Sequence, residues 1–157
     1  MWTGSENINY EYTQSQNSLK VRFKKLSEYA VAPSYAKDGD AGLDLTAHTL
    51  TDFKDEPFIE YGTGIAVEIP QGYVGLVFPR SSVSKKENFY LKNSVGVIDS
   101  GYRGEIKLRF SRSEDRYEAG EKVGQLIIIP YPTIYLEEVQ ELSSTERGEG
   151  GFGSTGI

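Results

Sequence analysis

A β-hairpin is predicted by the stretch Asn93-Ser-Val-Gly-Val-Ile-Asp-Ser-Gly-Tyr-Arg-Gly-Glu105 and the five residues that follow it. An apolar run ends at the carboxylate of Asp99, and Gly101 then marks a turn. Past the turn, Ile106-Lys-Leu-Arg-Phe110 alternates between apolar and charged residues, as a half-buried strand does. Such a hairpin could offer backbone N–H and C=O groups to a flat ligand, with Asp99 activating a water beside it. An ordinary hairpin with a turn-forming aspartate explains the same pattern.

Short strand-like segments recur along the rest of the chain. The expected strands are Leu19–Phe23, Gly42–Ala47, Gly64–Ile69, Tyr73–Phe78, Phe89–Leu91, Val95–Ile98, Glu105–Phe110, Gln125–Pro130 and Thr133–Val139. The turn signals between them are Lys37-Asp-Gly-Asp40, Pro70-Gln-Gly72 and Ala119-Gly-Glu121. Many short strands without a long helical period predict an all-β, jelly-roll-like barrel. One short helix is expected after Pro79-Arg-Ser-Ser82, where Ser81 or Ser82 can cap it.

Composition narrows the classes of function. The chain has 157 residues, enough for one domain with a real core, and a formal net charge of −6. Such an acidic chain is a poor candidate for binding nucleic acid or anionic membranes. It has no cysteine and one histidine, which excludes disulfides, a cysteine nucleophile and multi-histidine metal clusters. Because no long apolar run or signal peptide is visible, we expect an intracellular, cytoplasmic protein.

Three regions follow from the pattern of residues. Residues 1–18 are polar and aperiodic, and we interpret them as an N-terminal extension. Residues 19–142 carry the expected strands and form the barrel domain. In residues 143–157, five of the fifteen residues are glycine, and only Phe152 and Ile157 are large and apolar. Such a segment cannot bury enough surface to fold alone, so it is a flexible tail or an arm that orders on a ligand or partner.

Polar residues gather at four further places. Arg80 and Ser81 stand at a predicted helix start, a place that attracts phosphate, although a capped helix with a surface arginine fits equally well. Asp44 lies between leucines on a strand, where a carboxylate is either paired with a cation or held for a ligand. Gln125 begins an apolar strand. The glycine-rich tail could cradle phosphate, with Arg147 as its cation and Phe152 as a ring that stacks on a base.

Taken in order, five segments resemble the motifs of the homotrimeric deoxyuridine triphosphate nucleotidohydrolases, the dUTPases. They are Ala41–Leu45, Pro79–Ser84, Asn93–Glu105, Gly124–Leu126 and Arg147–Gly156. The resemblance covers about residues 19–156, and the order and spacing of all five motifs agree. Three departures leave the chemical groups in place: Ser82 stands where many relatives have glycine, Gly124 where alanine is common, and Gly101 where an acid is frequent.

The resemblance implies a role for each group of residues. Asp99 would deprotonate the attacking water, and Tyr102 would stack on the sugar and exclude a 2′-hydroxyl. The uracil reader would comprise Asn93, Gly96, Val97 and Ile98. The phosphate binders would be Arg80, Ser81, Ser82 and Gln125. The arm would contribute Arg147, Phe152, Gly153 and Ser154. Asp44 would lie near the metal and phosphates and act through water or through Arg80.

The implied reaction converts dUTP and water to dUMP and pyrophosphate by attack at the α-phosphorus. This reaction keeps uracil out of DNA and supplies dUMP for thymidylate synthesis. The resemblance also implies Mg²⁺ held mainly by phosphates and water, and a homotrimer whose active sites are shared between subunits. Two other functions are found on this scaffold. A dCTP deaminase on this fold needs a catalytic glutamate ten residues after Asp99, where this chain has Arg109. A non-catalytic regulatory protein on the same scaffold is the other.

Overall fold

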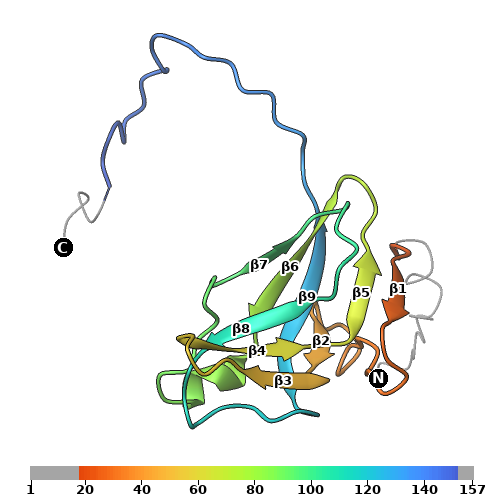
Figure 1. The fold of residues 1–157 in the computed structure, drawn as a ribbon. Coiled ribbons are helices and arrows are strands. Elements are labelled where there is room, and N and C mark those ends of the chain that lie inside the picture. The colour runs from red at the N-terminus through yellow and green to blue at the C-terminus, as the bar shows by residue number, and fades with distance from the viewer. Residues whose placement is uncertain (1–17, 152–157) are drawn as a thin grey trace, which may run out of the picture.

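Strands and one short 3-10 segment form the regular secondary structure of residues 18–151, the part of the chain that the computed structural model describes (Figure 1). The strands are β1 (Arg22–Lys25), β2 (Leu43–Thr46), β3 (Thr49–Asp52), β4 (Phe58–Gly62), β5 (Ile65–Glu68), β6 (Tyr73–Pro79), β7 (Gly96–Ile98), β8 (Lys107–Ser111) and β9 (Lys122–Pro130). They pair antiparallel in three sheets, ordered β2-β9-β6-β7, β3-β4-β8 and β1-β5. The prediction of an all-β fold is confirmed.

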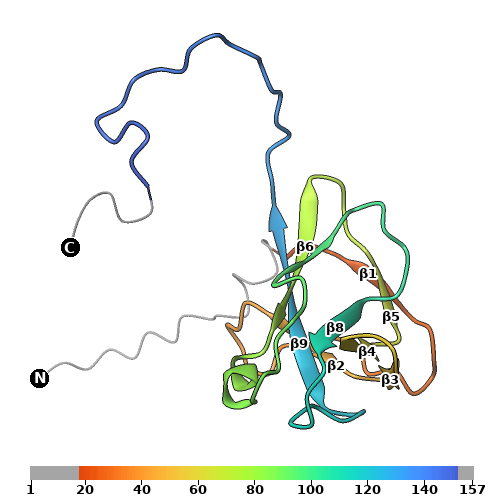
Figure 2. The ribbon, with the colours of Figure 1, turned by 60° about the vertical axis from the view of Figure 1, so that its left-hand side comes forward.

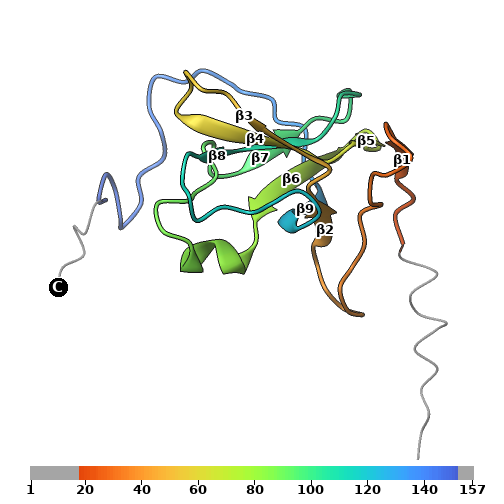
Figure 3. The ribbon, with the colours of Figure 1, turned by 60° about the horizontal axis from the view of Figure 1, so that its bottom comes forward.

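The core gathers buried side chains from both larger sheets. In the view of Figure 3, β3 and β4 lie above β2 and β9. Alternation along β8 puts Leu108 and Phe110 into the core and leaves Lys107 and Arg109 outside. Phe110 stacks on Phe89 with the ring centroids 4.6 Å apart. Burying large side chains in this way contributes about 1.5–3 kcal/mol each and is the main stabilising term of the barrel.

Two expected turns depend on glycines in the left-handed region. Gly72 follows Pro70 with a φ of 86°, and Gly120 precedes β9 with a φ of 93°. Residues with a side chain reach such φ values only at a cost in conformational energy. Gly72 and Gly120 therefore form the turns that the sequence predicts, just before β6 and β9.

Several strand predictions need correction. β3 and β4 were not predicted, because Thr49–Asp52 carries mixed residues and Phe58–Gly62 runs directly into a turn. Phe89–Leu91 is no strand: Phe89 and Leu91 are buried, and Leu91 makes a single bridge to Phe110. The first strand begins at Arg22 instead of Leu19.

The predicted hairpin is wrong in its pairing. β7 pairs with β6, and β8 pairs with β4, so the two strands belong to different sheets. Alternation identifies the buried face of a strand but not its partner. The turn itself is present, since the Tyr102 N–H donates to the Asp99 carbonyl at 3.0 Å. The segment is therefore a loop that connects two sheets. Its flanking strands do not hydrogen-bond to each other as the strands of a hairpin would.

The predicted helix is a single 3-10 segment, Ser81–Lys85. Arg80 is its N-cap residue, and no side chain caps it, so the predicted serine cap is wrong. The serine hydroxyls bond elsewhere: Ser84 donates to the Ser81 carbonyl at 2.7 Å, and Ser82 pairs with the Tyr117 hydroxyl at 2.8 Å.

After β9 the chain leaves the barrel. Figures 1 and 2 both show the segment that follows Pro130 running away from the sheets. The expected strand Thr133–Val139 is not formed among the described residues, and Ile134, Tyr135 and Leu136 are 73%, 89% and 87% exposed. A strand needs an edge to pair with, and this segment meets none in its own barrel. No helix within residues 18–151 is long and apolar enough to span a membrane.

Candidate active site

A cavity of about 550 Å³ opens beside the loop that joins β7 to β8. Its lining combines two groups of residues: Asn93, Val97, Ile98 and Tyr102 from the loop and β7, and Glu60, Lys92, Glu105, Lys107 and Arg109 from around it. The first group is the one that the sequence assigns to uracil and sugar. The second was not predicted.

The loop side of the cavity is exposed and partly apolar. Val97 is 62% exposed and Tyr102 is 44% exposed, so the apolar surfaces of both side chains are available to a ligand. Asp99 follows β7 directly and is also exposed. Gly96 lies opposite Val77 on β6, and a Cβ on Gly96 would approach the Val77 Cβ to 3.2 Å. The close approach of β6 and β7 therefore depends on this glycine.

The floor of the cavity is a buried carboxylate held by two cations. Glu60 is only 7% exposed, and its oxygens accept hydrogen bonds from Lys107 Nζ at 3.0 Å and Arg109 Nε at 2.8 Å. The Arg109 guanidinium also lies 4.7 Å from the centroid of the Phe58 ring. Burial alone raises the pKa of the Glu60 carboxyl, but the two hydrogen bonds outweigh burial and hold this pKa below its ordinary value.

A second polar cluster forms where β2, β9 and the end of β6 meet. The Asp44 carboxylate accepts a hydrogen bond from Lys122 Nζ at 2.6 Å and lies 3.6 Å from Arg80 Nε. Gln125 Nε2 donates to the Pro79 carbonyl at 3.3 Å. Two cations beside one carboxylate leave positive charge for an anion, so this cluster is chemically suited to phosphate. Asp44 is thus paired with cations, one of the two alternatives that the sequence left open.

The two serines at this end differ in exposure. Ser81 is exposed, whereas Ser82 is half-buried against Tyr117. Ser82 is therefore held by the barrel, and Ser81 is the more accessible of the two hydroxyls.

The cavity and the cluster lie at opposite ends of the same sheet. In the β6–β7 ladder Ile98 faces Gly75 and Gly96 faces Val77, so Asp99 continues toward the start of β6 while Arg80 follows its end. About six residues of strand separate them, or roughly 20 Å. Figure 1 shows the 3-10 helix after Arg80 at the bottom and the loop after β7 at the top. Within one chain, the structure does not bring Asp99 to the phosphate cluster.

The arm makes local contacts only as far as it is described. Arg147 donates from Nε to the Gly150 carbonyl at 3.0 Å, in a turn where Gly148 has a φ of 52°. Arg147 is exposed, and Figures 1 and 2 show the segment after β9 that carries it running away from the barrel. The predicted contacts Phe152, Gly153 and Ser154 lie outside the described residues.

No group of three histidine, cysteine, aspartate or glutamate side chains within residues 18–151 could hold a metal ion. The carboxylate of the phosphate cluster is already paired with Lys122 and Arg80. These residues fit a metal that arrives bound to phosphate oxygens better than one held by the protein itself.

Six residues of these two sites were not predicted: Glu60, Lys92, Glu105, Lys107, Arg109 and Lys122. One signal was available for Glu60, since it is a single carboxylate inside the apolar run Phe58–Tyr61. Lys107, Arg109 and Lys122 are charged residues on strands, and Lys92 and Glu105 lie in loops, a pattern that ordinary surface segments share.

Comparison with known proteins identifies the family. The family model described as dUTPase matches residues 28–156. The chain belongs to the dUTPase family. The deoxyuridine 5′-triphosphate nucleotidohydrolase of Dictyoglomus turgidum is 40% identical over 148 residues, covering 88% of this chain and 99% of the relative. That of a Hydrogenobaculum species is 41% identical over 143 residues, with 88% and 99% covered.

Solved dUTPase structures share the fold. A mutant dUTPase of Staphylococcus bacteriophage 80alpha, solved with dUpNHpp, matches with a TM-score of 0.77 at 30% identity and covers 89% of this chain and 100% of its own. A mutant dUTPase from phage phi11 of S. aureus, described with a structural Mg(II) ion, matches with a TM-score of 0.65 at 27% identity, covering 78% and 98%. The family is one whose members use Mg²⁺.

Proposed function

We propose that this protein hydrolyses dUTP to dUMP and pyrophosphate. The observation that carries the proposal is the cavity lined by Asn93, Val97, Ile98 and Tyr102 beside Asp99, in a chain about 40% identical to named dUTP nucleotidohydrolases. The reaction needs a positioned water and neutralised oxygen charge, and no covalent intermediate. In the cell it keeps uracil out of DNA and supplies dUMP for thymidylate synthesis, so we place the protein in the cytoplasm.

Asp99 is the proposed general base, because it is exposed and directly follows Ile98, which lines the cavity. Asn93 and the backbone of Gly96, Val97 and Ile98 read uracil. An N3–H donor and an O4 acceptor distinguish uracil from cytosine, and each mispaired buried group costs about 1–3 kcal/mol. Tyr102 packs against the sugar.

Phosphates bind at the cluster of Arg80, Ser81, Ser82 and Gln125, with Asp44 orienting Arg80. Mg²⁺ enters with the nucleotide, held by phosphate oxygens and water, and neutralises their charge. The arm, residues 143–157, closes over the bound nucleotide with Arg147, Phe152, Gly153 and Ser154 and excludes water.

A homotrimer with shared sites explains how residues at opposite ends of the sheet can act on one nucleotide. One nucleotide cannot engage Asp99 and Arg80 of the same chain across roughly 20 Å of strand. In a closed three-fold ring, the cavity of one subunit meets the phosphate cluster of the next, and a third subunit supplies the arm. Three identical sites then form from three incomplete chains.

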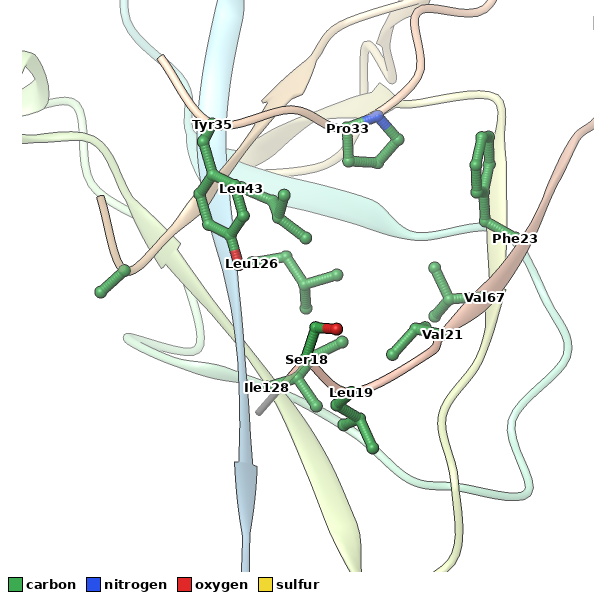
Figure 4. A pocket seen from close by; sticks show the side chains of 11 residues that line it. Ser18, Leu19, Val21, Phe23, Pro33, Tyr35, Leu43, Val67, Leu126 and Ile128 are labelled. Carbon is green, nitrogen blue, oxygen red and sulfur yellow. The ribbon is translucent and has the colours of Figure 1, made fainter. Parts of the chain in front are cut away.

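The barrel also presents a surface that such an assembly would cover. An apolar groove of about 470 Å³ lies between β1 and the sheet of β2 and β9, and Figure 4 shows Phe23, Leu43 and Leu126 among the side chains around it. Among the described residues, β1 pairs only with β5, which leaves its other edge free. The exposed segment Thr133–Val139 of a neighbouring subunit has the length and apolar character to fill this groove.

Glu60 places a carboxylate in the cavity, so it has to be compared with the catalytic glutamate of a dCTP deaminase. A deaminase glutamate must take up and release a proton. Glu60 is held charged by Arg109 and Lys107, which opposes proton uptake, and Arg109 occupies the position where the resemblance calls for the catalytic acid.

The test incubates the protein with Mg²⁺ and dUTP, dCTP, dTTP or UTP. The release of pyrophosphate and the release of ammonia are both measured. We expect pyrophosphate from dUTP far above the other three. Ammonia from dCTP would instead identify a deaminase. Binding of dUTP without any turnover would favour the regulatory alternative.

A further inference from the structure

Glu105 lies near the end of the loop that carries Asp99 and Tyr102, and it also lines the cavity. Its Oε1 accepts a hydrogen bond from the backbone N–H of Gly64 at 2.7 Å. Gly64 belongs to the turn between β4 and β5, and its φ of 66° is one that glycine adopts readily. The carboxylate therefore ties this loop to the turn between β4 and β5.

The turn is shaped to receive this carboxylate. A Cβ on Gly62 would lie 2.6 Å from Glu105 Oε1, so a residue with a side chain there would displace it. Beside it, the Thr63 hydroxyl donates to the Ile106 carbonyl at 2.8 Å, and the Ile106 N–H donates to the Ile65 carbonyl at 2.8 Å. The end of the loop is thus clamped by side-chain and backbone bonds together.

Tyr102 is anchored to the same residue. Its hydroxyl donates to the Glu105 backbone carbonyl at 3.0 Å. Its ring lies over Gly104, where a Cβ would come within 2.5 Å of the ring carbon Cζ. The ring is therefore held against the loop at the wall of the cavity, and the position of the Glu105 carbonyl sets where it stands.

We propose that Glu105 is a positioning residue for sugar selection: its bond to Gly64 fixes the carbonyl that holds Tyr102, and so fixes the room left beside the sugar of the nucleotide. The inference rests on dUTP hydrolysis as the function of this site and deepens it. A ring held in one place excludes a 2′-hydroxyl, whereas a ring free to move away admits it.

Charge at Glu105 is secondary to this bond. Lys107 Nζ lies 3.8 Å from Glu105 Oε2, but it is closer to Glu60, at 3.0 Å. The acceptor oxygen facing Gly64 is therefore the feature that matters, and glutamine can supply the same acceptor in nearly the same shape.

The experiment compares Glu105→Ala with Glu105→Gln, using kcat and KM for dUTP and for UTP with Mg²⁺. Glu105→Ala loses the acceptor, and we expect the preference for dUTP over UTP in kcat/KM to fall by about tenfold. Glu105→Gln should keep this preference within about threefold of the wild type. Tyr102→Phe keeps the ring and loses its anchor, and it should shift the preference in the same direction as Glu105→Ala.

Asp40→Ala is the matched control, because the Asp40 carboxylate also accepts a backbone N–H, that of Lys37 at 2.9 Å, in an exposed turn outside the site. It should leave the preference unchanged. Equal losses for dUTP and UTP in Glu105→Ala, or a Glu105→Gln variant as unselective as Glu105→Ala, would overturn the inference. If Glu105→Ala does not fold, an unchanged preference in Tyr102→Phe overturns it. A wild-type protein without dUTP turnover would instead refute the function itself.

Discussion

Asp44 on β2 lies directly opposite Gln125 on β9. Two segments about eighty residues apart in the sequence therefore meet, and Arg80 joins them from the end of β6. The Gln125 side chain packs closely against Gly42, where an added Cβ would lie 2.5 Å from the side-chain oxygen of Gln125. A cation cluster built on three neighbouring elements keeps its shape before any ligand binds, which is what efficient phosphate binding requires.

Replacing Asp99 with asparagine should abolish most catalysis while preserving the fold. The amide has the same shape but cannot accept the proton of the attacking water. Loss of a general base typically costs about 10²–10⁴ in rate. Single-turnover hydrolysis of dUTP measures catalysis, a binding assay measures the affinity for dUTP, and the thermal midpoint measures the stability of the fold. Near-normal turnover in this variant would remove Asp99 from the mechanism.

Removing the arm after Leu142 should cripple catalysis and leave stability almost unchanged. The described part of the removed segment is largely exposed and contacts no strand of its own barrel, so its loss costs little core. Catalysis suffers because the arm no longer closes over the nucleotide. The comparison is kcat/KM for dUTP against the thermal midpoint. Full activity in the truncated chain would show that Arg147 is an ordinary tail residue.

Glu60→Gln should destabilise the protein in a pH-dependent way. At pH 7 we expect a loss of about 1–3 kcal/mol in the free energy of unfolding, because two cations lose their carboxylate. The folded-state pKa of Glu60 lies below the ordinary 4.5, so its contribution is complete above that pH and is lost as the pH falls through the folded value. Urea denaturation of both proteins should therefore show a gap at pH 7 that narrows below pH 4.5. A gap of constant size would contradict the ion-pair account.

Gly124→Ala should destabilise the barrel. The added Cβ would lie 2.6 Å from Leu108 Cδ2 and 3.0 Å from the Phe78 carbonyl oxygen, and backbone cannot move aside cheaply. Overpacking of this kind costs about 1–3 kcal/mol. Gly101→Ala is the control, since a Cβ there meets nothing within 4 Å. Equal thermal midpoints for the two variants would contradict this reading of the packing.

The sequence was informative where a single residue type decides the local structure. Turn glycines such as Gly72 and Gly120, and the alternation in β8, predict the all-β class. Strand partners could not be predicted in the same way, because alternation in β7 and β8 says nothing of which sheet each joins.

The sequence predicts the motif residues of the candidate site but not the residues that hold them in place. Asp99, Tyr102 and Arg80 stand in recognisable motifs. Glu60 and Glu105 act through contacts with residues more than forty positions away, and only the fold creates those contacts. The separation of Asp99 from Arg80 likewise depends on the β6–β7 register.

The most direct measurement of the shared-site account is complementation between two inactive variants. Asp99→Asn keeps Arg80, and Arg80→Ala keeps Asp99, so neither variant alone can build a complete site. In trimers formed by refolding an equal mixture, random assembly gives about a quarter of the sites an intact Asp99 and an intact Arg80 from neighbouring chains. We predict that dUTP hydrolysis returns to about that fraction of the wild-type rate. No recovery, in mixed trimers verified by mass, would show that each chain builds its own site and would contradict the account.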